Sequence, residues 1–421
     1  MSEAISNLLK DVPMPRFVRV RQNFSAEHIT DIPGAVKEAL SRPDIEGTMR
    51  PGMRICLTCG SRGIDNNAQI IRAVADFCKE KGAIPFAIPA MGSHGGASAE
   101  GQRQMLAGLG ITEETIGCPI YSSMETLRIG TTQEGHPVQI DKLAAESDGI
   151  IVINRIKPHT SFRGTYESGL MKMMAIGLGK QKGAEICHAA GFPMMHHMVP
   201  LMGKAVLENG PVLFGLGIIE NAFDKTAQLH ALTPSQIIDR EPELLKVAAG
   251  LMPSLGFGEC DVLVVDQIGK NISGCGMDPN ITGVFATPGM TGGIKAQRRC
   301  VLSLTPQTHG NGYGMGAADC ITRRLFDALD LDALYPNAIT STSLGFSKIP
   351  LIMESDREAI ALCVRTCNEI CQEKARIIRI RDTLSLDEFE ISESLIPEMP
   401  EGMQILSEPH ELPFDEAGNL L

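Results

Sequence analysis

Short apolar runs alternate with amphipathic segments along most of the chain. The runs predict buried strands over residues 54–59, 83–90, 149–154, 212–219 and 261–266. Apolar positions at helical spacing predict a helix over 32–40, one capped by Asn66 or Asn67 and closed by Gly82, and another that starts near Ser98. Strands that alternate with helices are typical of α/β proteins built from parallel βαβ units. We therefore expect an α/β fold with mostly parallel or mixed sheets flanked by helices.

The segment 251–260 is interrupted by Gly and Pro and precedes a new apolar strand, which predicts a domain boundary near residue 258. A chain of 421 residues is long enough for two or three domains. We expect an N-terminal α/β domain over residues 1–258 and a C-terminal α/β domain over 259–385. The acidic, Pro-containing segment 386–421 is expected to be a tail that returns to the N-terminal domain.

Composition excludes several classes of protein. The net charge is −12 and aromatic residues make up 4% of the chain, whereas nucleic-acid binders carry a basic surface and stacking rings. No apolar run approaches the ~18 residues needed to span a bilayer, and the N-terminus lacks the features of a secretory signal. We expect a cytoplasmic protein that binds neither nucleic acid nor membrane.

The twelve cysteines are expected to be reduced thiols, because no export signal accompanies them. Cys56 and Cys59 form a lone C-x-x-C inside an expected strand, without a second pair at zinc spacing. A long helix is expected over about 356–373, with three cysteines four residues apart on one face, Cys363, Cys367 and Cys371. We interpret both groups as packing residues.

Polar and titratable side chains follow the expected strands, where open α/β sheets bind their ligands. Ser61 and Arg62 follow the first strand, and Arg62 could grip a phosphate or carboxylate or simply be solvated. His94 lies between glycines, just before an expected helix whose positive end favours a neutral imidazole that can act as a base. The simpler interpretation is a histidine that hydrogen-bonds a turn. His159 follows Pro158 after the third strand, and Lys270 follows the strand at 261–266.

Lys172 lies among apolar residues, where desolvation would lower the pKa of its ammonium group and make the amine nucleophilic. A lysine at a helix end whose ammonium reaches solvent explains the same spacing. His188 lies sixteen residues further on and could ligate a divalent metal ion. The adjacent His196 and His197 cannot share one helix face, so we interpret them as structural. A Gly-rich loop from His309 could form a wall for an anionic substrate together with Lys295, Arg298 and Arg299.

The ordered set of these motifs resembles the lactate racemase family of nickel-pincer-nucleotide enzymes. The matching segments are Gly92-Ser93-His94, Pro158-His159, Ser168-Gly169-Leu170-Met171-Lys172, the downstream His188, and Arg62 in the first strand loop. Leu170 replaces a glycine of the family motif, and a few extra residues separate the second motif from the third. These departures indicate a divergent subgroup.

The resemblance implies an isomerase that inverts the C2 carbon of a 2-hydroxy acid, such as a polar sugar acid, in a cleft between two domains. It implies that Lys172 carries a covalently tethered nickel-pincer nucleotide (a pyridinium bis-thiocarboxylate mononucleotide with nickel), and that His188 binds the nickel. His94 and His159 would then act as opposed bases. Cofactor contacts are expected from Ser61, Arg62, Gly92 and Ser93, and substrate contacts from Arg62, Lys270, Lys295 and His309. Lys180 and Lys182 are competing candidates for the tether.

Two alternatives stay open at this point. The same histidines could bind zinc or iron in a hydrolase or lyase, with no covalent adduct on the protein. The chain could also be a non-catalytic protein that binds a nucleotide or a metal cofactor, although such a carrier needs no opposed bases. The expected partners of the racemase are its small-molecule substrate and the enzymes that make the cofactor.

Overall fold

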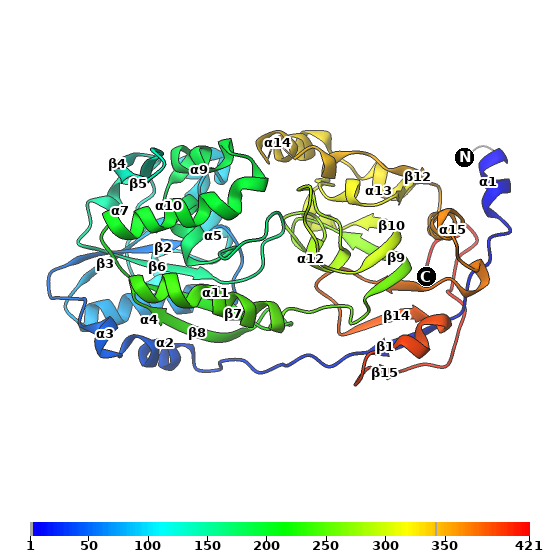
Figure 1. Cartoon of the computed structure of the whole chain (residues 1–421), viewed down its shortest axis with the longest axis horizontal. Coiled ribbons are helices and arrows are strands. Elements are labelled where there is room, and N and C mark those ends of the chain that lie inside the picture. Colours follow the sequence, from blue (N-terminus) through cyan, green and yellow to red (C-terminus); the bar gives the residue numbers. More distant parts are fainter. Residues whose placement is uncertain (1–2, 342) are drawn as a thin grey trace. The chain divides into compact units, whose positions relative to one another are not determined.

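The computed structural model describes residues 3–341 and 343–421, and the chain forms two compact units (Figure 1). One unit, Ser25–Met252, is continuous in sequence. The other combines the described part of residues 1–24 with Pro253–Leu421. We call them the continuous unit and the split unit, and each is described by itself.

The continuous unit is built on a five-stranded sheet in the order β3-β2-β6-β7-β8. The first four of these strands are parallel, and β8 is antiparallel to β7. A separate antiparallel ribbon pairs β4 with β5. The strand bounds are β2 Arg54–Cys59, β3 Ile84–Pro89, β4 Thr126–Thr131, β5 Pro137–Asp141, β6 Gly149–Arg155, β7 Val212–Glu220 and β8 Thr226–Leu232.

Helices cover both faces of this sheet, because its central strands are apolar on both sides. One buried cluster packs α2 and α4 against the sheet, and the other packs α8, α10 and α11 against the opposite face. The helix bounds are α2 Ile32–Leu40, α3 Pro43–Glu46, α4 Asn67–Glu80, α5 Ala99–Gly108, α6 Glu113–Ile116, α7 Lys142–Ala145, α8 Leu170–Lys172, α9 Lys180–Ala189, α10 Met195–Asn209 and α11 Pro234–Leu251.

The split unit contains an eight-stranded mixed sheet in the order β12-β11-β10-β9-β13-β14-β1-β15. Strands from β12 to β13 are parallel, and the pairs on the β14, β1 and β15 side are antiparallel. The strand bounds are β1 Phe17–Arg21, β9 Glu259–Ile268, β10 Lys295–Leu304, β11 Cys320–Thr322, β12 Leu351–Met353, β13 Ile377–Ile380, β14 Glu388–Ser392 and β15 Gln404–Ile405.

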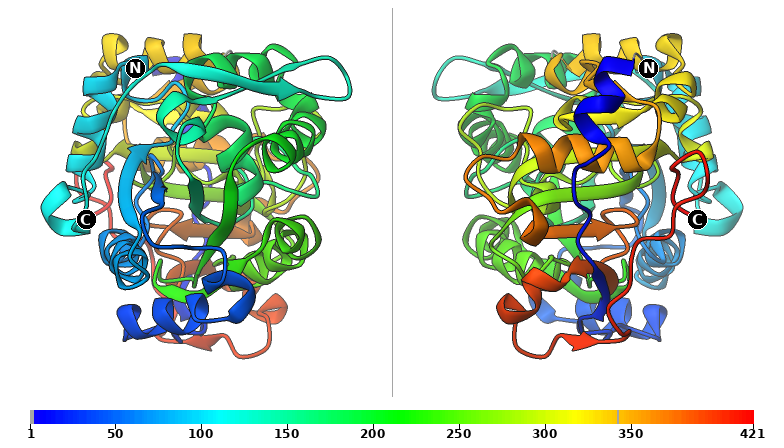
Figure 2. Two further views of the ribbon diagram at one scale, coloured as in Figure 1. Left: turned by 90° about the vertical axis from the view of Figure 1, so that its left-hand side faces the viewer. Right: turned by 90° about the vertical axis from the view of Figure 1, so that its right-hand side faces the viewer.

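Short helices accompany the sheet of the split unit, and α1 packs on α15 near the N-terminus (Figure 2). Their bounds are α1 Glu3–Leu9, α12 Pro279–Thr282, α13 Arg323–Asp327, α14 Leu331–Ser341 and α15 Asp356–Thr366. Among the described residues, no helix combines the length and the apolar character that a membrane crossing requires.

The predicted α/β class with mixed sheets is confirmed, and the expected strands and the helix over 32–40 form where the hydrophobic pattern placed them. Two local expectations were wrong. Asn66 adopts a left-handed conformation before α4, and its amide bonds the Asp65 carboxylate instead of capping the helix. The long helix expected over about 356–373 ends at Thr366, because Cys367 is already extended, and Cys371 is exposed.

The structure divides the chain differently from the division at residues 258 and 385. The N-terminal strand β1 pairs with β14 and β15, so residues before Phe24 belong to the same unit as the C-terminal half. The segment 386–421 therefore supplies strands to the split unit, where the sequence suggested a tail on the N-terminal domain. Pairing between the two ends of a chain leaves no periodic signal in either segment.

Candidate active site

The carboxyl ends of β2, β3 and β6 carry the loops that hold the predicted site residues of the continuous unit. Because these three strands are adjacent and parallel, their carboxyl ends lie at one edge of the sheet. Ser61 and Arg62 follow β2, the Gly92–His94 motif follows β3, and His159 follows β6.

Lys172 and His159 meet directly. The Lys172 Nζ atom lies 2.8 Å from His159 Nε2, and both side chains are partly buried. Lys172 ends the single-turn helix α8, and a π-helical turn over Met173–Gly177 follows it at once. Turns of this kind are frequent at functional sites.

The loop between His159 and Lys172 is organised by Glu167. Its buried carboxylate accepts a 2.6 Å hydrogen bond from the His159 backbone N–H and a 3.3 Å bond from the Gly164 N–H. Arg163 forms an ion pair with the same carboxylate at 3.3 Å. Lys157 and Ser168 close the loop through two backbone hydrogen bonds. The sequence analysis overlooked Glu167, although it directly precedes the Ser168–Lys172 motif.

The protonation of the pair follows from its contacts. The Ser161 backbone N–H donates to His159 Nδ1 at 2.9 Å, so in the neutral ring the proton resides on Nε2, which faces the Lys172 amine. Burial, with Lys172 and Arg62 nearby, holds the pKa of His159 well below its usual value. Burial, with Arg62 as the second cause, lowers the pKa of Lys172 to about 7. About half of the Lys172 side chains are therefore neutral amines near pH 7.

The start of α8 is held by a buried carboxyl group from α11. Glu241 is 1% exposed, and it accepts hydrogen bonds from the Met171 backbone N–H at 3.0 and 3.4 Å. Burial raises the pKa of Glu241 to about 8. A Cβ atom on Gly169 would lie 1.9 Å from Glu241 Oε1, so only glycine fits there. The sequence analysis missed Glu241 because seventy residues separate it from Met171.

His94 and Ser61 link the loops after β3 and β2. His94 Nδ1 lies 2.5 Å from Ser61 Oγ, and the His94 side chain is exposed. The Gly92 backbone N–H donates to the Gly177 carbonyl at 3.2 Å, in the π-helical turn that follows Lys172, and the Ser93 side chain is exposed. Arg62 is also exposed, and its charge contributes to the lowered pKa values of His159 and Lys172.

His188 lies in the last turn of α9. The residue is exposed, but partial desolvation and then the charge of Lys172 lower its pKa, which favours the neutral imidazole that can ligate a metal ion. Its ring packs edge-on against Phe192, with 5.6 Å between ring centroids. The neighbouring histidines have other roles: His196 Nδ1 bonds the Pro193 carbonyl, and His197 Nε2 bonds Glu134.

The two competing lysines differ from Lys172. Lys180 is completely buried and forms a 3.2 Å ion pair with Asp141. Its Nζ also donates to the Gln102 side chain and to the Pro89 carbonyl. Lys182 is exposed on the first turn of α9. Lys172 therefore combines a lowered pKa with an amine that forms no ion pair with a carboxylate in the part of the chain that the structure describes.

The remaining substrate candidates belong to the split unit. Lys270 follows the carboxyl end of β9, and its Nζ lies 4.3 Å from the centre of the Tyr313 ring. His309 follows the adjacent strand β10, and Thr308 beside it accepts the Lys270 backbone N–H at 3.1 Å. These two candidates thus lie at the same edge of the sheet.

Lys295 lies at the other end of β10, opposite Glu259 of β9. Ten residues of strand separate it from the Lys270 edge, which corresponds to roughly 30 Å. Arg298 bonds Thr366 at the end of α15, and Arg299 bonds three backbone carbonyls, those of Thr282, Ile294 and Ala296. The structure therefore does not bring Lys295, Arg298 and Arg299 together with His309 in one wall.

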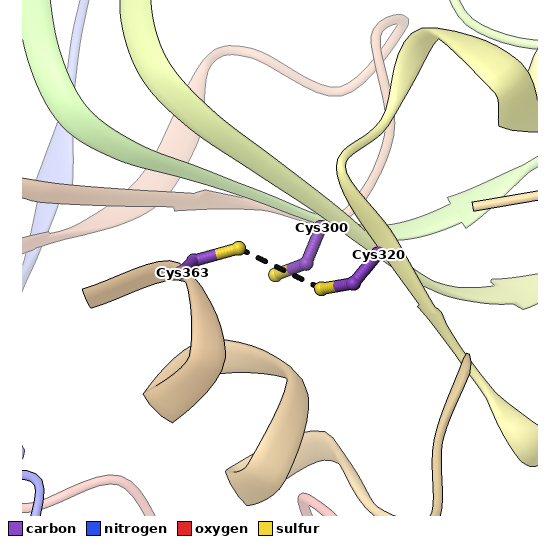
Figure 3. Close-up of side chains that lie close together, drawn as sticks. All are labelled: Cys300, Cys320 and Cys363. Atoms are coloured by element: carbon purple, nitrogen blue, oxygen red, sulfur yellow. Dashed lines mark hydrogen bonds between the residues drawn. The ribbon is translucent and has the colours of Figure 1, made fainter. Parts of the chain in front are cut away.

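Cys300, Cys320 and Cys363 bring three buried sulfur atoms within 4.8 Å of one another in the split unit (Figure 3). They come from β10, β11 and α15, and the Cys320 and Cys363 sulfurs are 3.6 Å apart. Three soft donors could hold a soft metal ion, but only as thiolates. Hydrogen bonds within the triad raise the pKa of Cys300 and Cys363 and lower the pKa of Cys320 to about 5. The three side chains pack α15 against β10 and β11.

Comparison with known proteins gives one family match and a similar solved structure. Residues 7–198 match the family model of the lactate racemase N-terminal domain. The structure of the lactate racemase apoprotein from Thermoanaerobacterium thermosaccharolyticum has the same fold, with a TM-score of 0.50 and 12% sequence identity over 87% of this chain and 93% of that chain. No sequence among the curated proteins matches the chain.

The similarity therefore relates residues 7–198 to the N-terminal domain of lactate racemase, and the α/β fold resembles that of the lactate racemase apoprotein.

Proposed function

We propose that this protein is a racemase or epimerase of 2-hydroxy acids that uses a nickel-pincer nucleotide tethered to Lys172. The observation that carries the proposal is the Lys172–His159 pair. An amine with a pKa of about 7, beside an imidazole whose tautomer is fixed, is a nucleophile ready for covalent attachment at neutral pH. His188 supplies the imidazole ligand that nickel prefers, and Arg62 supplies a cation for a phosphate or carboxylate.

These residues fit the cofactor that the family implies. When bound, the nickel-pincer nucleotide supplies a site that takes up a hydride and returns it. Lys172 would hold it covalently, His188 would bind its nickel, and Ser61, Arg62, Gly92 and Ser93 would surround it. Supply of this group requires the enzymes that make it, so we propose them as partners. The free state of all twelve cysteines supports a reducing, cytoplasmic setting.

His94 and His159 would move the proton of the substrate hydroxyl. Inversion at C2 needs a base on each side of the carbon, because the 2-keto acid formed midway is planar and is reduced again from its other face. The two histidines belong to loops that follow different strands, β3 and β6. Ser61 contacts His94 at Nδ1, which leaves Nε2 of that ring to accept a proton. The Ser161 N–H bonds His159 at Nδ1, so His159 carries its proton on Nε2 and would donate it from that atom.

The substrate is proposed to be a polar 2-hydroxy acid such as a sugar acid. Its carboxylate would bind Arg62. In the split unit, Lys270 and His309 lie at one edge of their sheet and Lys295 at the opposite edge, so only Lys270 and His309 could bind one anion together.

Intact-mass spectrometry of denatured protein, combined with metal analysis, tests the tether. The protein is taken from its native host or co-expressed with the cofactor-making enzymes. We expect a covalent adduct and about one nickel per chain in the wild type. The adduct should be absent from Lys172→Ala and present in Lys182→Ala. An unmodified wild type from a competent host, with zinc or iron bound, would instead favour a metal-dependent hydrolase or lyase.

The roles of the two histidines are tested separately. His94→Ala and His159→Ala should each abolish racemisation while the adduct on Lys172 still forms, because neither residue is the tether. Chiral chromatography of 2-hydroxy acids measures the loss. Wild-type rates in both variants would show that these histidines are not the bases.

A further inference from the structure

Gln102 on α5, Asp141 at the end of β5 and Lys180 at the start of α9 are fully buried in the continuous unit. Burial of an amide and two charged groups is unfavourable unless each finds partners. The partners in this case are one another and the loop that carries His94. None of the three side chains has a role in the proposed racemase reaction.

Lys180 fixes the orientation of the Gln102 amide. Its Nζ pairs with Asp141 at 3.2 Å and donates to Gln102 Oε1 at 3.2 Å. The Pro89 carbonyl at the end of β3 accepts a third hydrogen bond from the same ammonium group. Because an ammonium group can only donate, the oxygen of Gln102 must face Lys180 and the NH₂ group must face away from it.

The NH₂ group of Gln102 holds the backbone on both sides of Ser93. It donates to the Gly92 carbonyl at 2.9 Å and to the His94 carbonyl at 3.1 Å. Both N–H bonds of the Gln102 amide therefore donate to backbone carbonyls of the segment that ends at His94. Asp141 is fixed in turn by the backbone N–H groups of Leu143 and Ala144, which it accepts at 2.8 and 3.2 Å.

The loop needs such an external contact. Its backbone is left-handed at four positions, with φ values of 60° at Gly92, 65° at Gly95, 64° at Gly96 and 51° at Ala97. Glycine adopts these angles without steric cost but loses much conformational freedom when it is fixed. Within the loop itself, the contacts that fix His94 include the hydrogen bond from its backbone N–H to the Met91 carbonyl at 3.2 Å.

We infer that Asp141, Lys180 and Gln102 form a positioning network that holds the Gly92–His94 segment and so places the His94 imidazole for proton transfer. Lys180 thereby serves the reaction without touching the substrate or the cofactor. The role of the network in proton transfer rests on the proposed function, whereas its hydrogen bonds to the loop are independent of that function.

Gln102→Glu tests whether the hydrogen bonds from residue 102 to the Gly92–His94 segment hold the loop. The carboxylate still accepts from Lys180 but offers no N–H to Gly92 or His94. The matched control is Gln104→Glu, an exposed residue two positions along the same helix. Amide hydrogen exchange of residues 92–98, followed by mass spectrometry, should become roughly tenfold faster in Gln102→Glu and stay at the wild-type rate in the control. Exchange of β2 and β6 should not change, which shows that the fold is intact.

In cofactor-loaded enzyme, Gln102→Glu should lower kcat by about 10- to 100-fold with little change in KM, because small misplacements of a reacting group slow catalysis to this extent. The ¹⁵N signals of His94 should broaden or shift in apoprotein as well. If Gln102→Glu does not fold, Gln102→Asn replaces it, since the shorter amide cannot reach all three partners, and Gln104→Asn is then its control.

Wild-type exchange of residues 92–98 in the folded variant would overturn the hold on the loop. A loosened loop with unchanged kcat, KM and pH profile would overturn the role in proton transfer. Absence of racemase activity in the loaded wild type would count against the proposed function alone, because the exchange and His94 signals are measured without turnover.

Discussion

Lys172 and Lys180 lie eight positions apart in the continuous unit, and both are removed from solvent to a large degree, yet their surroundings are opposite. Lys180 has a buried carboxylate, an amide oxygen and a carbonyl around its ammonium group. Lys172 has an imidazole at 2.8 Å and the positive charge of Arg62 nearby. Burial lowers the pKa of both lysines, but at Lys180 Asp141 opposes this effect.

The comparison shows that burial alone does not make a lysine reactive. A buried ammonium group with a carboxylate and two further acceptors is a structural cation, and a covalent bond at its nitrogen would break all three contacts. A buried amine beside a neutral imidazole and a guanidinium loses its proton easily and keeps its lone pair for a bond. The partner of each lysine therefore decides between a structural and a chemical role.

The largest effect is expected from Lys180→Met. It leaves the Asp141 carboxylate buried without its counter-charge, so we expect a loss of about 3–5 kcal/mol in the free energy of unfolding, measured by urea denaturation. Lys182→Met, on the exposed side of the same helix, should stay within about 0.5 kcal/mol of the wild type.

The double variant Lys180→Met/Asp141→Leu sharpens this contrast. It removes both buried charges, so it should be more stable than Lys180→Met alone. If Lys180→Met were as stable as Lys182→Met, Lys180 would not be the structural cation that its contacts describe.

A smaller effect, without any change in the fold, is expected from pH. In apoprotein the Lys172 amine should be acylated half-maximally near pH 7, whereas exposed lysines need a pH nearer 10. The unfolded chain keeps this proton up to about pH 10 while the fold releases it near pH 7, so the contribution of Lys172 to stability rises as the pH increases through this range. Peptide mass spectrometry after brief acylation measures the midpoint.

Arg62→Gln tests whether the lowered pKa of Lys172 sets this midpoint. Arg62 is the second cause of the lowered pKa of Lys172, so its removal should move the midpoint of acylation to higher pH. A midpoint near 10 in the wild type would show that Lys172 resembles an ordinary surface lysine, and the contrast with Lys180 would disappear.

Hydrophobic pattern alone predicted the strands that carry the site and the loops after them, because buried parallel strands are continuous apolar runs. It also pointed to Lys172 as a candidate because of its apolar neighbours. It could not separate Lys172 from Lys180, since the difference arises from Asp141 and His159, which reach these lysines only through the tertiary fold. Glu241 was missed for the same reason, because its contact with Met171 joins segments that are distant in sequence.

The candidates of the split unit show a different limit. Lys295 and His309 are close in sequence, and the basic residues Arg298 and Arg299 between them suggested one surface for an anionic substrate. The intervening segment is the ten-residue strand β10, which places them at opposite edges of the sheet. A strand that the sequence pattern does not reveal separates two residues by its whole length, whereas a loop with the same number of residues can bring them together.

The pairing of β1 with β14 has a consequence for the order in which this protein is made. Residues 25–252 are complete once the first part of the chain has left the ribosome, so the unit with Lys172 can fold while synthesis continues. Strand β1 emerges before this unit and must wait for Glu388–Ser392, which are translated more than three hundred residues later. The surroundings of Lys172 are thus expected to form on a nascent chain whose other unit still lacks its sheet partners.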